Sequence, residues 1–280
     1  MAILWLSSFP KSGNTWVRAL LANYLGANDG PVALDTLRQV FVADSQLWPY
    51  EQAAGRKLPN AAIEDIMPFK AQAQALLVPK SEALVFAKTH SALRRISGYP
   101  TITPDVTAGA IYILRNPLDV TLSYADHFGL SHSDAISAMA SPHLITMGRA
   151  NRAPEFLGAW SGHVDGWTRA PGLSRLVLRY EDLQLDAADC LTRIIAFLQQ
   201  GVDANKIERA VKNSSFETLS NQEALSGFKE RSRNQKRFFR NGTSGQWREE
   251  LTPDLIAKVI DAHHDIMTKY GYLDAKGEPV

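Results

Sequence analysis

The sequence has few of the features that mark secreted, metal-binding and membrane proteins. Cys190 is its only cysteine, which excludes an intramolecular disulfide and a cysteine-based metal site. The formal net charge is +1, so no overall field favours nucleic acid or a membrane surface as a partner. The apolar run at the N-terminus is too short for a signal peptide or a membrane span, and no basic segment precedes it. We therefore expect a cytoplasmic protein that binds neither nucleic acid nor membrane.

A strand–loop–helix pattern at the start of the chain predicts an anion-binding site. The apolar run that begins at Ile3 is typical of a buried strand, and residues 17–25 have the pattern of an amphipathic helix. The loop between them contains Lys11, Gly13 and several short polar side chains. Backbone N–H groups, the helix dipole and the ammonium of Lys11 all attract an anion there, and Gly13 lets the backbone approach it. A simple helix cap would explain one residue of this loop but not the set, so we expect a phosphate or sulfate group.

Three later apolar segments predict further buried strands, over residues 84–87, 110–114 and 176–180. Strands that alternate with helical stretches imply an α/β fold, with a central parallel sheet flanked by helices on both faces. Ligands of such sheets bind beyond the carboxyl ends of the strands. The residues at or just after the predicted strand ends are Lys11, Lys88, His90, Arg115 and Tyr180. The sequence therefore predicts one site at one edge of the sheet.

We expect residues 1–280 to form a single domain, because no repeat or linker divides them. Residues 26–80 and 128–170 have helical patterns without recognisable chemistry and are expected to lie on the acceptor side. Residues 221–247 are polar, basic and punctuated by glycine, which predicts a long loop that closes as a lid.

Five segments, in order along the chain, resemble the motifs of the PAPS-dependent sulfotransferases, including bacterial members (PAPS is 3′-phosphoadenosine 5′-phosphosulfate). The segments are Phe9-Pro10-Lys11-Ser12-Gly13-Asn14-Thr15-Trp16, Lys88-Thr89-His90, Arg115-Asn116-Pro117-Leu118-Asp119-Val120 with Ser123, Tyr180-Glu181-Asp182-Leu183, and Arg240-Asn241-Gly242-Thr243-Ser244-Gly245-Gln246-Trp247. One such motif alone would be weak, but five in order span nearly the whole chain. The resemblance implies a P-loop-like fold and transfer of a sulfuryl group from PAPS to a hydroxyl or amine of a small molecule, leaving PAP.

The resemblance also implies roles for individual residues. Lys11 would contact the bridging oxygen and the sulfuryl group, and the 5′-phosphate would lie on Ser12, Gly13, Asn14 and Thr15. The 3′-phosphate would be held by Arg115, Ser123, Arg240, Asn241 and Gly242. Adenine would lie among Trp16, Tyr180, Ser214 and Phe216. His90 would be the general base, Lys88 would assist the transferring group, and no metal would be required.

General chemistry agrees with these implied roles. Sulfuryl transfer should resemble phosphoryl transfer, in which positioning and electrostatics carry most of the catalysis. A histidine is the side chain best suited to remove a hydroxyl proton near neutral pH. The chain has seven histidines, and only His90 follows a lysine at a strand end. We read the other six as surface or packing residues: His127, His132, His143, His163, His263 and His264.

Two alternatives stay open at this point. A metal-dependent nucleotide kinase would use Glu181 or Asp182, which follow a predicted strand, as a magnesium ligand. Its usual phosphate loop does not match, because Lys11 precedes Gly13 and no glycine lies upstream. A non-catalytic nucleotide-binding protein would keep the Lys11 loop but would not need His90. Residues 248–253 lack the dimer motif of the animal cytosolic enzymes, so the oligomeric state is open, and no motif identifies the acceptor.

Overall fold

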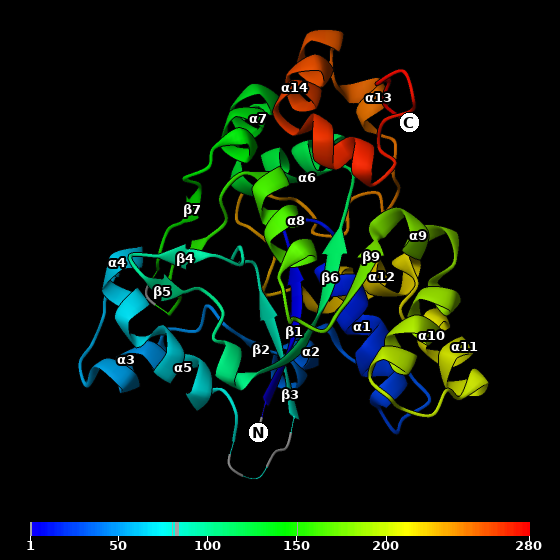
Figure 1. Ribbon diagram of the computed structural model, residues 1–280. Helices are drawn as coiled ribbons and strands as arrows, with labels where there is room; N and C mark the ends of the chain where they lie inside the picture. Colours follow the sequence, from blue (N-terminus) through cyan, green and yellow to red (C-terminus); the bar gives the residue numbers. More distant parts are fainter. Residues whose placement is uncertain (1, 80, 82–83, 150) are drawn as a thin grey trace.

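The computed structural model has a five-stranded parallel sheet at its centre and describes residues 2–79, 81, 84–149 and 151–280 (Figure 1). The strands are β1 (Ala2–Ser8), β2 (Val42–Ala43), β3 (Leu84–Thr89), β6 (Thr107–Leu114) and β9 (Arg175–Arg179), arranged in the order β2-β3-β1-β6-β9. Every neighbouring pair is parallel. The predicted α/β class is confirmed, and the four predicted strands are present. The edge strand β2 was missed because two residues carry no readable pattern.

Helices cover both faces of the sheet because its strands are apolar on both sides (Figure 1). Trp5 and Tyr112 pack into one core, and Leu6 and Ile113 into the other, as the alternation of a strand requires. The first core includes α6 (Pro117–Phe128), α7 (His132–Ala140), α8 (Trp160–Arg169) and α14 (Pro253–Lys269). The second includes α1 (Asn14–Leu25), α2 (Leu37–Val40), α9 (Tyr180–Leu185), α10 (Ala187–Phe197), α11 (Ala204–Asn213) and α12 (Phe216–Ser226).

A smaller apolar cluster lies beside the β2 edge and supports the end of β3. It includes residues of α3 (Trp48–Ala54) and α5 (Lys70–Leu76), together with α4 (Ile63–Ile66). The buried carboxylate of Asp44 accepts a bond from the ammonium of Lys70 at 2.8 Å and another from the Thr89 hydroxyl at 3.1 Å. A buried charge is tolerated only when it is paired in this way. The network fixes Thr89, the residue before His90.

The remaining elements are short. They are the helix α13 (Trp247–Glu250), the paired strands β4 (Arg95–Ile96) and β5 (Tyr99–Pro100), the paired strands β7 (Ile145–Thr146) and β8 (Glu155–Phe156), and the 3₁₀ turns Leu34–Thr36, Met67–Phe69 and Pro104–Val106.

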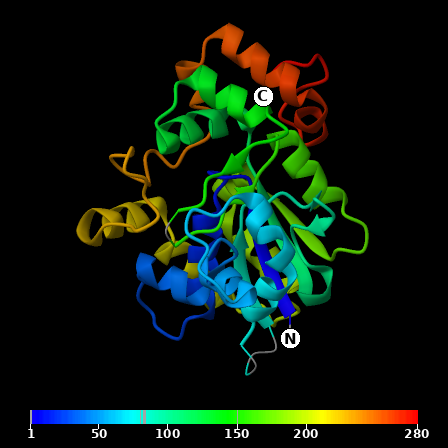
Figure 2. The ribbon, with the colours of Figure 1, turned by 90° about the vertical axis from the view of Figure 1, so that its left-hand side faces the viewer.

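The irregular segment for which the sequence predicts a lid is shorter than expected. Helix α12 continues to Ser226, so the irregular stretch covers residues 227–246, and it runs from α12 toward α13 and α14 (Figure 2). The helix is anchored by Glu223, whose carboxylate accepts backbone N–H bonds from Phe238 and Phe239 at 2.7 and 3.0 Å. The predicted acceptor-side ranges include residues 80 and 150, which lie outside the described residues.

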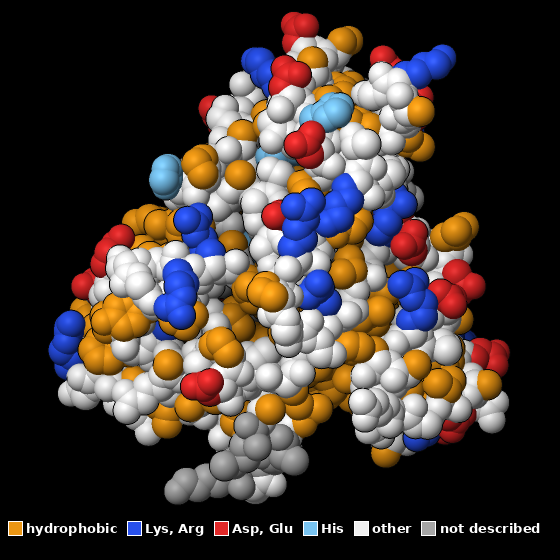
Figure 3. All heavy atoms as spheres, viewed as in Figure 1, with side chains coloured by type: hydrophobic (Ala, Val, Ile, Leu, Met, Phe, Trp, Pro, Cys, Tyr) orange, Lys and Arg blue, Asp and Glu red, His pale blue; other side chains and the backbone are white. Residues whose placement is uncertain are grey.

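The surface in Figure 3 carries basic and acidic side chains interspersed with hydrophobic ones. This mixture agrees with the formal net charge of +1. Within the part of the chain that the structure describes, no helix is both long and apolar enough to cross a membrane.

Candidate active site

The loop between β1 and α1 forms a cradle at the carboxyl edge of the sheet. Helix α1 begins at Asn14, and Gly13 before it has a φ of 101°, a conformation that side chains disfavour. A Cβ atom at Gly13 would lie 2.6 Å from Cδ2 of Tyr180, so the backbone and this ring approach more closely than any other residue allows. The buried atoms Oγ of Ser12 and Oδ1 of Asn14 have no hydrogen-bond partner among the described residues. Of these two atoms the Ser12 hydroxyl can donate, and an unpaired donor beside a helix N-terminus is what an anion site requires.

A cavity of about 740 Å³ opens over this cradle and collects residues from distant parts of the chain. It is lined by fourteen of the sixteen residues that the sequence predicts for the site: Lys11, Gly13, Asn14, Thr15, Trp16, Lys88, His90, Arg115, Ser123, Tyr180, Phe216, Arg240, Asn241 and Gly242. Ser12 and Ser214 do not line it. The Ser214 side chain is fully buried and its Oγ accepts a bond from Nδ2 of Asn23 at 3.1 Å, so the structure does not bring it to the predicted adenine pocket.

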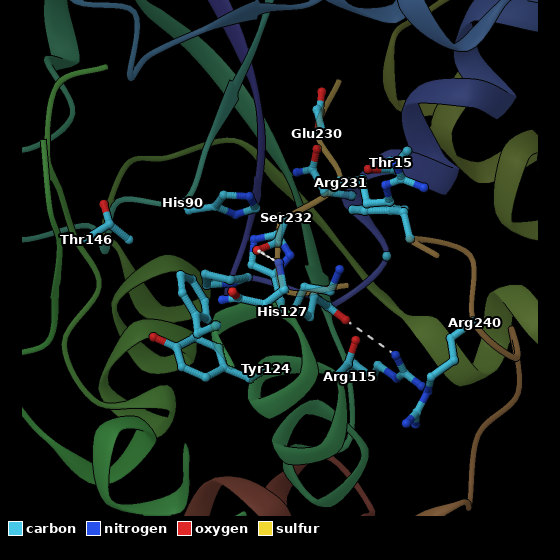
Figure 4. A pocket seen from close by; sticks show the side chains of 18 of the residues that line it. Thr15, His90, Arg115, Tyr124, His127, Thr146, Glu230, Arg231, Ser232 and Arg240 are labelled. Atoms are coloured by element: carbon cyan, nitrogen blue, oxygen red, sulfur yellow. Dashed lines mark hydrogen bonds between the residues drawn. The ribbon is translucent and has the colours of Figure 1, made fainter. Parts of the chain in front are cut away.

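Two arginines approach the cavity from the side of β6 and the irregular segment (Figure 4). Arg115 follows β6, stacks on the ring of Tyr180 at 4.3 Å and donates to the carbonyl oxygens of Lys11 and Thr243 at 3.4 and 3.2 Å. Its buried Nε has no partner among the described residues. Arg240 is held by the side chains of Gln246 and Glu250 at 3.0 and 3.4 Å. These forked donors leave N–H groups for phosphate oxygens.

Aromatic rings form the wall between the two arginines and α1. Trp16 meets Tyr180 edge to face, with 5.6 Å between the ring centroids. Phe216 lies against Gly242, where a Cβ atom would be only 2.2 Å from its Cδ2. A planar nucleobase could stack on the faces of these rings and contact their edges.

His90 is fixed by hydrogen bonds of both its backbone and its ring, and its imidazole points into the cavity (Figure 4). Its backbone N–H donates to Oε1 of Glu155 at 2.8 Å, and its carbonyl lies 3.0 Å from Nε2 of His163. Its Nδ1 lies 2.8 Å from the Ser8 carbonyl, an acceptor only, so Nδ1 carries the hydrogen and Nε2 keeps its lone pair. Burial, assisted by the charge of Lys88, holds the pKa of His90 well below 6.5, so the ring is neutral at pH 7. An exposed lone pair on a neutral, oriented imidazole is the requirement for a general base.

Glu230 is a member of the site that the sequence did not reveal. Its carboxylate bonds to the guanidinium of Arg18 at 2.7 and 2.9 Å and to the ammonium of Lys88 at 3.0 Å. Burial acts to raise the pKa of Glu230, but these two cations outweigh it and hold the pKa well below 4.5. The one signal in the sequence was an isolated acid within the basic run 229–237.

Lys11 is nearly surrounded by protein. Its Nζ lies 3.9 Å from the centroid of the Phe238 ring. Burial lowers the pKa of Lys11 to about 7, with nearby Lys88 and Arg115 adding to the effect and Asp126 and Glu230 opposing it. An anion beside Lys11 would stabilise the charged ammonium, so binding of an anion and protonation of Lys11 favour each other.

The far side of the cavity is apolar and comes from α6, α7 and the segment after α7. Its apolar lining residues include Leu122, Tyr124, Phe128, Leu130, Ala138, Leu144, Ile145 and Met147. His127, which we expected at the surface or in packing, also lines the cavity and bonds through Nδ1 to Gln235 at 2.8 Å (Figure 4). Burial lowers the pKa of His127 to about 4, so it is neutral. His163 is a packing residue as expected, and it also positions His90.

The geometry does not favour Glu181 as a metal ligand. Its Oε1 accepts the backbone N–H of Asn116 and its Oε2 accepts the Tyr272 hydroxyl, both at 2.9 Å, so both oxygens hold the structure together. Across residues 2–79, 81, 84–149 and 151–280, no group of three or more His, Cys, Asp or Glu side chains is placed to hold a metal ion.

Comparison with known proteins points to one family. The family described as the sulfotransferase domain matches residues 3–271. Cytosolic sulfotransferase 17 of Arabidopsis thaliana is 25% identical, over 97% of this chain and 76% of the relative. Sulfotransferase 1E1 of Mus musculus is 24% identical, over 93% of this chain and 81% of the relative. The crystal structure of retinol dehydratase with androsterone and inactive cofactor PAP has the same fold, with a TM-score of 0.65 and 20% identity over 95% of this chain and 80% of that one.

Proposed function

The chain belongs to the sulfotransferase family, and we propose that it moves a sulfuryl group from PAPS to a hydroxyl or amine of a small molecule held beside His90. One observation carries this proposal: the lone pair of a neutral, oriented His90 faces the same cavity as the Lys11 loop and Arg115. A binding protein has no use for such a base, whereas transfer to a hydroxyl requires one.

The donor would lie along the β1–β6–β9 side of the cavity. The N–H groups after Gly13 and the hydroxyl of Ser12, whose Oγ is unpaired among the described residues, would donate to the 5′-phosphate, since the first turn of α1 points its donors there. Arg115 and Arg240, with Ser123, Asn241 and Gly242, would hold the 3′-phosphate. Trp16, Tyr180 and Phe216 would contact adenine. Ser12 would contribute its backbone N–H, and we assign no contact to Ser214.

The chemistry would be carried by three side chains. His90 would take the proton of the acceptor through Nε2. Lys11 would stabilise negative charge on the oxygen between phosphorus and sulfur, and Lys88 would do so at the sulfuryl oxygens. Lys88 is held by Glu230 in the free protein, so this role needs Glu230 to share or release it.

The same proposal covers the organisation of the chain. Residues 1–280 would form one sulfotransferase domain in which residues 128–170 provide much of the acceptor wall and residues 227–246 close over the donor. The plant relative is called cytosolic, and the single buried cysteine suits a reducing compartment, so we extend a cytoplasmic location to this chain. A small-molecule acceptor fits a cavity of this size.

The test compares His90→Gln with His132→Gln, a half-buried histidine that does not line the cavity. Turnover with labelled PAPS and a panel of phenols, alcohols and amines should fall by about 10²–10⁴-fold in the first variant and stay unchanged in the second. PAP should raise the melting temperature of both variants without magnesium, and far more than ADP does. Unchanged turnover in His90→Gln would contradict the assignment of His90 as the general base. Equal shifts in melting temperature with PAP and ADP would contradict the proposed 3′-phosphate site.

A further inference from the structure

A second, smaller cavity lies against the acceptor side of His90. It measures about 330 Å³ and is continuous with the main cavity, because seven residues line both: Ser45, Lys88, His90, Arg149, Arg152, Glu155 and Glu230. At roughly 30 Å³ for each water of the liquid, this space exceeds what a few ordered waters fill. We call it the side cavity. Its position beside the base makes it available to part of an acceptor.

The lining of the side cavity is strongly basic. It contains five cations, Arg18, Arg38, Lys88, Arg149 and Arg152, and only two carboxylates, Glu155 and Glu230. Arg18 and Lys88 share the single carboxylate of Glu230, and Glu155 accepts the backbone N–H of His90. The guanidinium groups of Arg38, Arg149 and Arg152 form neither an ion pair nor a hydrogen bond with the described residues. Three exposed forked donors thus line one hollow, where Glu155 is the one lining carboxylate that forms no ion pair with the described residues.

The sheet topology separates these arginines from the cations that the donor would use. Arg115 follows β6, on one side of β1, whereas Arg38 comes just before β2, on the other side. The segment with Arg149 and Arg152 is fastened to the end of β2 by backbone bonds from Leu47 to Asn151 at 3.1 Å and from Ala153 to Ser45 at 2.9 Å. His90 follows directly after β3, which lies between the two groups. The geometry therefore supplies a second anion-binding region on the acceptor side.

We propose that the acceptor of this enzyme is anionic, with a carboxylate or phosphate group bound in the side cavity by Arg38, Arg149 and Arg152 while its hydroxyl lies at His90. This inference rests on the proposed function. Carboxylates and phosphates each present two oxygens that one guanidinium group can bind through two parallel N–H···O hydrogen bonds. The apolar wall formed by α6 and α7 remains for the body of the molecule.

The test measures binding separately from turnover. Calorimetry on the enzyme with PAP bound would compare matched acceptors: para-hydroxyphenylacetate with its neutral amide, and tyrosol phosphate with tyrosol. In at least one pair the anionic member should bind about tenfold more tightly at low ionic strength. The preference should shrink to about twofold or less in the double variant Arg149→Gln with Arg152→Gln. Preference in one pair alone would identify the anion as carboxylate or phosphate.

A control and a second readout separate the two proposals. Arg193→Gln removes an exposed arginine on α10 that lines neither cavity, and should keep the full preference. Transfer assays on the same pairs should show the preference in KM, with kcat nearly unchanged. Equal binding or no binding of both members in every pair overturns the anionic acceptor, even if neutral acceptors are sulfated. The anionic compounds could instead bind selectively, depend on Arg149 and Arg152, and yet not be sulfated. That result would support the anion site in the side cavity and overturn the proposed function.

Discussion

Replacement of Glu230 by glutamine tests the electrostatic balance of the free site. The change keeps the shape of the side chain but removes the one negative charge that pairs with both Arg18 and Lys88. The Arg18 side chain is 1% exposed and that of Glu230 is 10% exposed, so water cannot take over the lost role. Removing one partner of a buried ion pair costs about 3–5 kcal/mol because the other charge stays buried. Glutamine can still accept one bond, and we therefore expect a loss of about 3 kcal/mol in the free energy of unfolding.

Thermal and urea unfolding of the free protein would measure this loss. For a chain of this length, about 3 kcal/mol corresponds to a fall of about 5 °C in melting temperature. The control Glu208→Gln changes an exposed glutamate on α11 and should shift stability by less than about 0.5 kcal/mol. A fall of less than about 1 °C in Glu230→Gln would refute the idea that this carboxylate neutralises the site.

The pH dependence of the same variant gives a second check with a defined sign. The pKa of Glu230 is held well below its ordinary value of 4.5 in the folded protein. The stability that it contributes is therefore fully present above pH 4.5 and is lost as the pH falls through the lower folded value. Glu230→Gln should lose less stability than the wild-type protein on acidification below this pH. Parallel curves would show that another group carries the acid sensitivity.

Two further predictions concern donor binding. The pKa of Lys11 is about 7 in the free protein, and a bound anion raises it, so Lys11 should take up a proton when PAP binds. PAP should therefore bind more weakly as the pH rises from 7 toward 9. Calorimetry in buffers of different ionisation enthalpy measures this proton uptake, and no uptake would contradict the placement of the anion beside Lys11. Gly242→Ala should weaken PAP binding by about tenfold, because its Cβ would displace the ring of Phe216, whereas Gly201→Ala, where a Cβ meets open space, should bind PAP normally. Equal affinities of the two glycine variants for PAP would contradict the proposed contact between Phe216 and the donor.

The sequence predicted those parts of the fold and site that depend on local patterns. Apolar runs located the four long strands, and the rule that parallel strands end together brought Lys11, His90 and Arg115 to one cavity. Helix α12 is capped by Ser215, whose hydroxyl accepts the N–H of Thr218 at 3.2 Å, a contact between near neighbours in the sequence. Each of these features depends on a few neighbouring residues and a general rule.

The features that escaped prediction depend on the path of the folded chain. Glu230 and Arg18 are 212 positions apart, and the sequence around either residue does not indicate that the other is its partner. Ser214 was assigned to the cavity by resemblance, but Asn23 of α1 holds its hydroxyl in the interior. His163 positions His90 only because α8 packs on the same face as Tyr112, whose hydroxyl bonds to the other ring nitrogen at 2.8 Å.

The charges around His90 connect the strength of the base to the presence of the donor. In the free protein, burial and the ammonium of Lys88 both lower the pKa of His90, so the imidazole is neutral but weakly basic. Negative oxygens placed beside Lys88 would cancel that ammonium and leave burial as the main effect, so the pKa of His90 would rise. A proton acceptor works best when its pKa lies near the pH of the reaction. We therefore expect the apparent pKa of the base, read from the pH profile of kcat, to lie above the value that titration of His90 gives in the free protein. The same pKa in both states would mean that Lys88 does not link the donor to the base.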